Sequence, residues 1–300
     1  MKKAIVFHVL ISLLIFTSCS TKQTKNNDES FSFIFMSDIH LQEELNAVKA
    51  FTKAIDTINK INPDFVITGG DLIMDALDVN YEQANTAFDL YKKKSKKINA
   101  PVYNTLGNHD IFGVYSEDEA ILNHPEYGEK MFENKLGPSY QSFNHKNWKF
   151  MILNTIEETE NKKYHGLIDE EQINWIKEEL SKTDSEMPIV ISTHFPFISA
   201  YNQWSLNRTV ASSSSWVIQN GKEVLSLFKD HNLKLVLQGH LHIQEEIKIN
   251  GVHFITGGSI ASNWWEGSYE GFEEGFLKFI IHKDDFEYEF VDYGWDAIKK

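Results

Sequence analysis

The sequence predicts an α/β fold in which two stacked sheets carry helices on their outer faces. From residue 31 onward, short apolar runs typical of strands alternate with amphipathic runs of helical period. From residue 243 onward, β-like runs dominate. Alternation followed by a β-rich tail indicates layered sheets with helices outside. The chain has 300 residues, which suits one large domain, and we expect that domain at residues 31–300.

The first half of this domain is expected to alternate between strand and helix. In the first expected helix, Val48, Phe51, Ile55 and Ile58 recur at helical spacing, and Pro63 follows its end. Residues 111–139 show no clean period and are expected to form a long insertion. The expected strands are 31–36, 64–68 and 101–105, and the expected helices are 45–61 and 81–98.

The second half is expected to begin with a hairpin and to end in strands. The hairpin spans 140–143 and 149–154, and an acidic amphipathic helix follows at 169–180. Serine-rich residues 199–222 are expected to form a second long loop, before a short helix at 223–230. The remaining expected strands are 188–192, 233–237, 243–249, 252–256, 276–281 and 286–291.

Residues 1–18 have the pattern of a lipoprotein signal peptide. Met1-Lys2-Lys3 carries positive charge, and an apolar run of thirteen residues follows at 4–16. This run is too short to cross a membrane, which takes about 18 residues. Phe16-Thr17-Ser18-Cys19 resembles a bacterial lipobox, in which Cys19 is lipidated and becomes the mature N-terminus. The alternative is a plain secretory peptide with an incidental cysteine.

Residues 19–30 are polar and are expected to be a flexible tether between the lipid and the domain. These features predict a protein of the cell envelope, outside the cytoplasm, on the periplasmic face or the cell surface. Its contact with the membrane would be made through the N-terminal lipid. Cys19 is the only cysteine, so no disulfide within the chain is possible.

The charge of the chain excludes one class of partner. The formal net charge is −14 and the pI is near 5.3. No basic stripe offsets this balance, so a nucleic-acid partner is not expected. The same acidity means that the positive charge needed by any anionic substrate has to come from something other than the chain itself.

Five short polar motifs fall where expected strands end. Ligands of α/β sheets bind beyond the carboxyl ends of the strands, so residues far apart in sequence can meet there. Carboxylate, amide and imidazole groups suit Zn, Mn or Fe, and one carboxylate can bridge two ions. Each motif alone is weak evidence for a metal site, whereas the whole set, in this order and at successive strand ends, is strong evidence for one. The motifs are Asp38-x-His40, Gly70-Asp71, Gly107-Asn108-His109-Asp110, His194 and Gly239-His240-Leu241-His242.

This ordered set resembles the calcineurin-like metallophosphoesterase superfamily, over roughly residues 31–292. The segments 143–155 and 166–180 and the pair Trp264-Trp265 are also similar to bacterial members. The resemblance implies a four-layer α-β-β-α sandwich of two mixed sheets. It also implies two sets of metal ligands that share Asp71. The first set is Asp38, His40, Asp71 and His242, and the second is Asp71, Asn108, His194 and His240.

The resemblance further implies a mechanism. Two divalent or trivalent ions (Mn, Fe or Zn) hold a hydroxide that attacks phosphorus, and they supply the positive charge that the acidic chain lacks. His109 is implied as the general acid for the leaving oxygen, or as a donor to the phosphate. Asp110 is implied as a residue that orients the His109 imidazole.

The pattern differs from that of purple acid phosphatases. Those enzymes have glycine where this chain has His40, and they have a ligand tyrosine after the Gly-Asp motif, which residues 71–75 lack. The motifs are nearer to cyclic-nucleotide phosphodiesterases, so the favoured function is hydrolysis of a phosphodiester. One alternative is a phosphomonoesterase such as a nucleotidase. An alternative of another class is a non-catalytic surface lipoprotein that binds a phosphoryl ligand.

Three further residues are candidates for substrate binding. Arg208 is the only arginine, and a guanidinium near the metal site could clamp phosphate, but an ordinary exposed loop residue is the favoured interpretation. Trp264 and Trp265 follow the last strand ends. Adjacent strand residues face opposite ways, so one indole could be core and the other could stack a nucleobase, or both could be core. The remaining histidines considered, His145, His165, His253 and His282, are expected to be structural or exposed.

Overall fold

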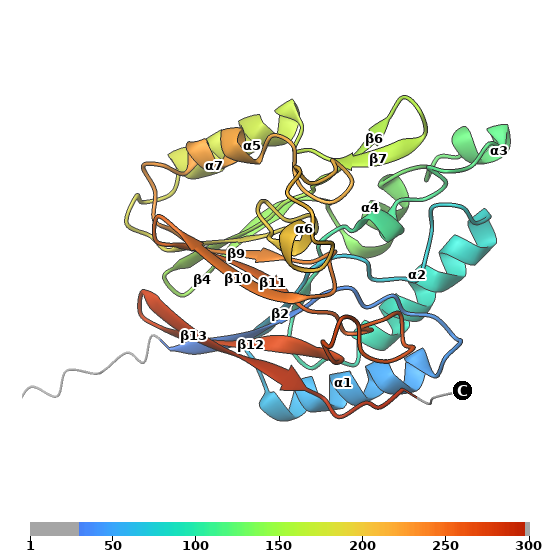
Figure 1. The fold of residues 1–300 in the computed structure, drawn as a ribbon, viewed down its shortest axis with the longest axis horizontal. Coiled ribbons are helices and arrows are strands. Elements are labelled where there is room, and N and C mark those ends of the chain that lie inside the picture. The colour runs from blue at the N-terminus through green and yellow to red at the C-terminus, as the bar shows by residue number, and fades with distance from the viewer. Residues whose placement is uncertain (1–29, 298–300) are drawn as a thin grey trace, which may run out of the picture.

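The computed structural model describes residues 30–297, and its elements form two sheets with helices outside both (Figure 1). The predicted signal peptide, Cys19 and nearly all of the predicted tether lie outside the described residues. Within residues 30–297, none of the helices combines the length and hydropathy needed to cross a bilayer.

The first sheet has five strands in the order β13-β12-β1-β2-β3. The neighbours β1, β2 and β3 run parallel, and β12 runs antiparallel to β1. The expected strand 101–105 is reduced to two residues. The bounds are β1 (Phe31–Met36), β2 (Phe65–Thr68), β3 (Val102–Tyr103), β12 (Gly275–His282) and β13 (Asp285–Asp292).

The second sheet has six strands in the order β10-β11-β9-β8-β5-β4. Its four inner strands run parallel, and the edge strands β4 and β10 are antiparallel to their neighbours. The bounds are β4 (Gln141–His145), β5 (Trp148–Ile152), β8 (Ile189–Ser192), β9 (Leu233–Gln238), β10 (Gln244–Ile249) and β11 (Val252–Gly257).

Aromatic side chains fill the space between the two sheets. Phe33 of β1 stacks on Phe65 of β2 at 5.3 Å and on Phe279 of β12 at 4.7 Å. Phe150, from β5 of the other sheet, meets Phe33 edge-on at 5.5 Å. These rings are fully buried or nearly so, and each ring buries about 150–250 Å² of apolar surface, so this layer holds the sheets together.

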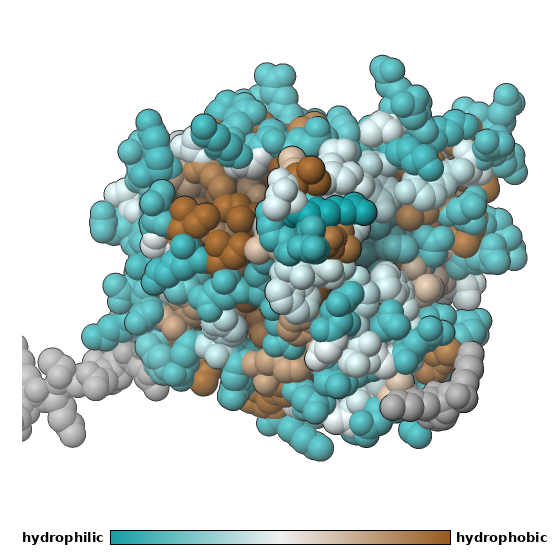
Figure 2. Space-filling view, in the orientation of Figure 1, coloured by the Kyte–Doolittle hydropathy of each residue, from teal (hydrophilic) through white to brown (hydrophobic). Residues whose placement is uncertain are grey.

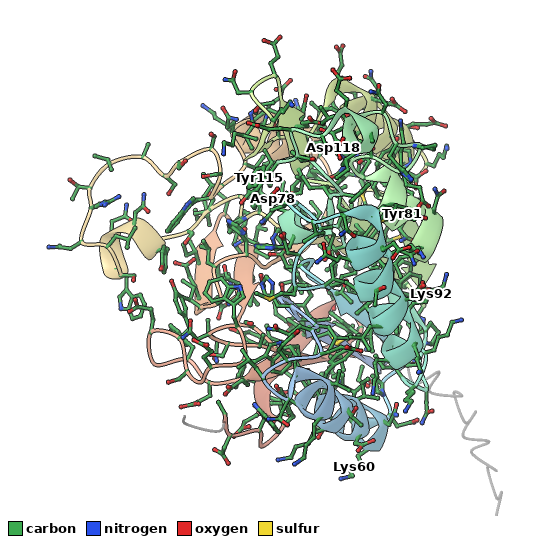
Figure 3. All side chains as sticks on the ribbon, turned by 90° about the vertical axis from the view of Figure 1, so that its right-hand side faces the viewer. Lys60, Asp78, Tyr81, Lys92, Tyr115 and Asp118 are labelled. Atoms are coloured by element: carbon green, nitrogen blue, oxygen red, sulfur yellow. The ribbon has the colours of Figure 1, made fainter. Side chains whose placement is uncertain are left out.

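Helices cover the outer face of each sheet, which confirms the expected α-β-β-α order. α1 (Ala47–Ile61) and α2 (Tyr81–Ser95) cover the first sheet, and α5 (Glu170–Ser181) and α7 (Gly221–Leu227) cover the second (Figure 1). α1 buries the stripe Ala47, Ala50, Phe51, Ala54, Ile55 and Ile58, as its period predicts. Figure 3 shows Lys60 and Lys92 on the solvent side of α1 and α2.

The two predicted loops contain short elements that the sequence pattern does not reveal. The insertion at 111–139 contains α3 (Glu119–Leu122) and α4 (Lys130–Leu136), and residues 199–222 contain α6 (Tyr201–Trp204). A hairpin of β6 (Ile156–Thr159) and β7 (Lys163–Gly166) was also not predicted. These elements are four to seven residues long. Such lengths are too short for a period to emerge from a sequence window.

Candidate metal centre

The structure brings all five polar motifs to one edge of the sandwich. Asp38 and His40 follow β1, Asp71 follows β2, and Asn108 begins a short 3-10 turn, η1 (Asn108–Asp110), after β3. His194 follows β8, and His240 and His242 follow β9. Because β1–β3 run parallel in one sheet and β8–β9 in the other, their carboxyl ends meet at this edge.

Asp38, His40, His242 and Asp71 form the first group of ligand atoms. His242 Nε2 lies 3.4 Å from Asp38 Oδ1 and 3.1 Å from His40 Nε2. His40 Nε2 lies 3.6 Å from Asp71 Oδ2. All four side chains are buried, so these atoms face one another without solvent between them.

Asp71, Asn108, His194 and His240 form the second group. His194 Nε2 lies 3.3 Å from Asp71 Oδ2 and 2.9 Å from Asn108 Oδ1. Donor atoms of Asp71, His194 and His240 all lie within 4.8 Å of one another. Asp71 Oδ2 therefore faces a histidine of each group, while its Oδ1 accepts the backbone N–H of His109 at 2.8 Å.

Backbone carbonyls determine which ring nitrogen of three histidines carries the proton. His194 Nδ1 donates to Gly69 O at 2.7 Å, and His240 Nε2 donates to Ser215 O at 3.0 Å. His242 Nδ1 donates in the same way to Ser262 O. A carbonyl can only accept, so in each neutral ring the other nitrogen presents a lone pair to the site.

These lone pairs make the site suitable for cations. The His194 Nε2 lone pair points at two further acceptors, Asn108 Oδ1 and Asp71 Oδ2. Buried acceptors facing one another repel unless a positive charge lies between them. Imidazole nitrogens with carboxylate and amide oxygens are ligands that suit Zn, Mn or Fe. The residues therefore fit the expected metal ions.

The pKa values of the buried histidines and Asp71 also indicate that the site is stabilised by a bound positive charge. Burial lowers the pKa of His40 well below its ordinary value, which keeps that ring neutral and able to bind a metal. Burial opposes charge on Asp71 too, but His194 and His109 hold the pKa of Asp71 well below its usual range. Despite burial, the Asp71 carboxylate raises the pKa of His194 to about 9, so a proton binds there readily when no other cation does.

Several residues of the site have a backbone conformation that is rare for residues other than glycine. Asp38, His40, Asp71, His240 and His242 all have left-handed φ values, from 43° to 72°. Few non-glycine residues adopt this region, and such residues concentrate at functional sites because the surrounding structure has to hold them there. Five of the seven predicted ligands share this conformation.

Two glycines allow the strand ends to approach closely. Gly70 has φ 90°, and a Cβ there would lie 2.5 Å from His194 Nδ1. A Cβ on Gly107 would lie 2.1 Å from the backbone nitrogen of Asp71. A side chain at Gly70 would push His194 away from the site, and a side chain at Gly107 would push Asp71 away from its partners.

His109 borders the site and pairs with a different carboxylate from the one expected. Its side chain is 26% exposed, and its Nδ1 lies 3.3 Å from Asp75 Oδ1, although the pair is not aligned as a hydrogen bond. Despite burial, Asp71 and Asp75 raise the pKa of His109 to about 9. A ring atom of His109 also lies within 4.8 Å of donor atoms of His40 and Asp71.

Asp110 has a structural role instead of the expected contact with the imidazole. Its carboxylate accepts the backbone N–H groups of Leu72 at 2.9 Å, Ile73 at 3.3 Å and Gly107 at 2.9 Å. Burial and the neighbouring Asp71 raise the pKa of Asp110 to about 7. Asp110 thus joins the two loops that carry Asp71 and Asn108, and the prediction that it orients His109 is corrected in favour of Asp75.

A cavity of about 240 Å³ lies over the ligand groups. Among the described residues, its wall contains no lysine or arginine. Aromatic side chains make up much of the rest, and they come mainly from two surface loops. They are Tyr164, Tyr201, Trp216, Trp264 and Tyr269.

Comparison with known proteins identifies the family. The sequence model of the calcineurin-like phosphoesterases matches residues 31–244, which is more than half of the chain. The chain belongs to this family. The family predicted from the five motifs is therefore confirmed, together with its class of enzyme, the phosphoric ester hydrolases.

Two bacterial relatives of this chain have cyclic nucleotides in their names. One is the 3′,5′-cyclic adenosine monophosphate phosphodiesterase CpdA of Haemophilus influenzae, 23% identical over 219 residues. The match covers 69% of this chain and 65% of that protein, so this chain spans just under two thirds of its length. The other is a probable cyclic nucleotide phosphodiesterase of Xenorhabdus bovienii, 22% identical over 78% of this chain and 87% of that protein.

A solved structure supports the fold. The dimetal phosphatase from Danio rerio superposes with a TM-score of 0.62 and covers 89% of this chain and 97% of its own. The two sequences are 15% identical, so the likeness shows the family fold and nothing narrower.

The two adjacent tryptophans, Trp264 and Trp265, lie in different surroundings in the structure. Trp264 lines the cavity, with its ring 4.6 Å from that of His242. Trp265 is 2% exposed and donates from Nε1 to His40 O at 2.9 Å, so it belongs to the core and not to a substrate site. Of the two alternatives, the structure shows one indole in the core and one in the cavity wall, but the reason given for that alternative was wrong. Both residues lie in a turn with positive φ, not on a strand.

Arg208 and the other histidines do not join the site. Arg208 is exposed in the loop after His194 and does not line the cavity, so the proposed phosphate clamp is not supported. Three of these histidines lie near acidic residues: His145 is 3.4 Å from Asp64, His253 is 2.5 Å from Glu246 and His282 is 3.4 Å from Glu287. The fourth, His165, has its Nε2 buried without a hydrogen-bond partner.

Sequence reasoning missed Asp75, Tyr164, Tyr201 and Tyr269. Asp75 follows the ligand Asp71 by four residues, which was the one available signal. Tyr164 accepts the amide N–H of Asn108 at 3.2 Å, and so turns the amide oxygen toward His194. No sequence pattern marks the tyrosines, because only the folding of distant loops brings them to the cavity.

Proposed function

We propose that this chain hydrolyses phosphodiesters with the help of two metal ions at the carboxyl ends of its strands. Two groups of buried ligand atoms that share Asp71 Oδ2 support a dinuclear centre. The names of the two bacterial relatives support a diester as substrate.

The absence of lysine and arginine from the described cavity wall is the observation that carries this proposal. A phosphomonoester bears up to two negative charges at neutral pH, because its second pKa is about 6, whereas a phosphodiester bears one. Enzymes that bind transferring phosphoryl groups commonly clamp them with Arg or Lys. A cavity whose positive charge would come from metal ions and the single ring of His109, and whose wall is largely aromatic, favours the singly charged diester.

The chain's own residues have separable tasks in this reaction. Bound metal ions supply Lewis acidity and lower the pKa of water toward neutrality. The neutral rings of His40 and His240 keep lone pairs available to those ions because burial lowers their pKa values. His109 reaches the cavity with a proton, and Asp75 beside its Nδ1 favours the charged ring. His109 is therefore positioned to protonate a leaving oxygen.

A panel of substrates tests this proposal. The protein, loaded in turn with Mn²⁺, Zn²⁺ or Fe²⁺, would be assayed with bis(4-nitrophenyl) phosphate, 4-nitrophenyl phosphate, cyclic nucleotides and 5′-nucleotides. We expect kcat/KM for diesters to exceed that for the matching monoesters by at least about tenfold, a difference of about 1.4 kcal/mol. A preference for monoesters would favour the nucleotidase alternative. Full metal content without hydrolysis would favour the non-catalytic binder.

We also propose that the protein is anchored by a lipid on Cys19 in the cell envelope. The support is the lipobox-like segment Phe16-Thr17-Ser18-Cys19. The chain enters the fold at Phe31, the amino end of β1, while Asp38 follows the carboxyl end. An anchor at Cys19 would thus join the end of the sandwich opposite the cavity, leaving the cavity turned away from the membrane and open to soluble substrates.

The same end of the molecule carries an apolar area. A cavity between the α7 segment and the β10–β11 hairpin is lined in part by Leu225, Phe228, Ile249, Val252 and Phe254, of which Phe228 and Phe254 are buried. Figure 2 shows a brown area among hydrophilic residues over these elements. Ile249 is 42% exposed. An apolar area at this end is compatible with a nearby bilayer.

A further inference from the structure

Two surface loops each orient one histidine of the candidate metal centre. The α6 loop, residues 199–220, provides Ser215 O, which accepts from His240 Nε2 at 3.0 Å. The tryptophan loop, residues 258–274, provides Ser262 O, which accepts from His242 Nδ1. Figure 3 shows the segment around α6 projecting from the body of the sandwich. Trp265 anchors the tryptophan loop in the core, and contacts between the two loops would further limit their movement.

These loops are joined by a hydrogen bond and by an aromatic contact, in which the rings of Trp204 and Phe272 lie 5.7 Å apart. The hydroxyls of Tyr201 in the α6 loop and Tyr269 in the tryptophan loop lie 2.6 Å apart. Tyr201 is 4% exposed, and burial raises the pKa of Tyr269, which keeps the Tyr269 hydroxyl protonated at neutral pH. Both residues line the cavity.

A continuous set of contacts runs from this bond to both histidines. On one side, the Tyr269 N–H donates to Ser262 Oγ at 2.9 Å, and Ser262 O accepts from His242. On the other side, the Tyr201 ring lies 5.1 Å from that of Trp216, the neighbour of Ser215. Leu241, between the two histidines in sequence, is buried in the apolar cluster that contains Tyr201, Trp216 and Tyr269.

We propose that Tyr201 and Tyr269 are positioning residues for the metal centre. Their hydroxyl bond clamps the two loops, so that Ser215 and Ser262 hold His240 and His242 in the tautomers that present lone pairs to the ions. This inference rests on the proposed metal centre, and it adds that the loops bordering the substrate cavity also control how firmly the ions are held. Partners that orient ligand histidines typically contribute about 10–100-fold to metal affinity.

The test measures metal binding without substrate. Apo protein would be titrated with Zn²⁺ or Mn²⁺ in competition with a chromogenic chelator, for wild type, Tyr201→Phe, Tyr269→Phe and the double variant. Each single variant removes the bond between the loops and leaves the other hydroxyl without its partner, and we expect its metal affinity to fall about 3- to 10-fold. The double variant leaves no lone hydroxyl, so its loss should be smaller than the product of the single losses.

Tyr288→Phe is the matched control. Its hydroxyl donates to Glu246 Oε2 at 2.7 Å, between β13 and β10 and outside the cavity wall. This variant loses a bond of the same kind, and its metal affinity should equal that of wild type. An equal loss in the control would show a general effect on stability and would overturn the proposal.

A second readout keeps the inference separate from the proposed function. In apo protein, ¹⁵N chemical shifts report which ring nitrogen of His240 and His242 is protonated. We expect one fixed tautomer of each in wild type and a mixture in the single variants. Fixed tautomers in both single variants, or unchanged affinity where wild type binds metal, would overturn the inference. A wild type that binds no metal contradicts the proposed function instead, and the tautomers then decide the inference alone.

Discussion

Asp71 uses its two carboxylate oxygens for different purposes. Oδ1 accepts the backbone N–H of His109, which fixes the carboxylate, and Oδ2 faces His40 and His194 from the two ligand groups. The same residue has φ 51°, and Gly107 packs so closely against it that a Cβ there would lie 2.3 Å from Asp71 Oδ1. The unusual backbone conformation of Asp71 therefore holds its carboxylate where both ligand groups can share it.

Replacing Asp71 should therefore empty both groups. In Asp71→Asn the shared charge is gone, and we expect metal content to fall from two ions per chain to fewer than one. Hydrolysis of bis(4-nitrophenyl) phosphate should fall with it. Metal content is measured by mass spectrometry of the desalted protein. Retention of two ions would contradict a bridging role.

Replacing His109 should separate chemistry from metal binding. In His109→Ala we expect nearly unchanged metal content and a kcat lower by about 10²–10⁴-fold, the usual contribution of a positioned general acid. The loss should be largest for esters with poor leaving groups and smaller for nitrophenyl esters, whose oxygen departs readily as an anion. Equal losses would indicate that His109 binds phosphate instead.

Replacing Asp75 should lower activity but not stability, whereas replacing Asp110 should lower stability. Asp75→Asn removes the charge beside His109 Nδ1, so kcat should fall while the free energy of unfolding stays nearly constant. Asp110→Ala leaves three buried N–H groups without an acceptor, at a cost of about 1–3 kcal/mol each. Urea unfolding of both variants measures the difference. A stable, inactive Asp110→Ala would restore the role first expected for that residue.

At the scale of elements, a buried ion pair joins β5 to α5. Lys149 Nζ donates to Glu179 Oε2 at 2.8 Å, with side-chain exposures of 8% and 17%, and Ser142 of β4 donates to the same oxygen. Burial by itself would raise the pKa of Glu179, but the hydrogen bonds from Lys149 and Ser142 outweigh it and lower that pKa. These bonds hold an outer helix on the sheet that carries His194 and His240.

This pair should make stability depend on pH in the acid range. The pKa of Glu179 is lower in the folded state than its ordinary value of 4.5, so the stabilisation is present above about pH 4.5 and is lost as pH falls through the folded pKa. At pH 7, Glu179→Gln should lower the free energy of unfolding by about 1–3 kcal/mol, and the difference from wild type should shrink below pH 4.

Glu178→Gln is the control on the same helix. Glu178 pairs with Lys182 at 2.8 Å, but both side chains are more than half exposed. Exposed pairs contribute little to stability, so this variant should unfold almost as wild type does at every pH. Equal effects of the two substitutions would contradict a special role for the buried pair.

At the scale of the whole molecule, the stacking of two sheets decides where the site lies and which way it faces. The aromatic layer around Phe33 aligns the sheets so that the ends of β1–β3 meet those of β8 and β9. The amino end of β1, where the chain enters the fold, lies at the opposite end. A lipid at Cys19 would therefore anchor the molecule without covering its cavity.

Cys19→Ala tests this anchoring. Acyl chains supply the affinity of a lipoprotein for the bilayer, so the variant should either be released into the aqueous phase or stall before processing. Partitioning of the expressed protein into Triton X-114 measures the change. Cys19→Ala that still partitions with detergent would contradict lipidation. Activity of the released form should match that of wild type, because the cavity lies away from the anchor.

The sequence by itself determined the family, the order of the main elements and the identity of the candidate ligands. The periods of α1 and α5 and the apolar strand runs come from local burial, which leaves a regular trace in sequence. The five motifs are short and ordered, so they are recognisable without any knowledge of distances. The short elements α3, α4, α6 and the β6–β7 hairpin left no such trace.

Only the tertiary structure decided which partners these residues have. Asp75, not Asp110, lies beside His109, because the carboxylate of Asp110 accepts the backbone N–H groups of Leu72, Ile73 and Gly107 instead. Trp265 lies in the core, and Arg208 is exposed to solvent. Tyr201 forms a hydrogen bond with Tyr269, which is 68 residues away in the sequence. The physical reason is the same in each case. Composition and period report burial along one segment, whereas these contacts depend on how separate loops pack at the shared edge of two sheets.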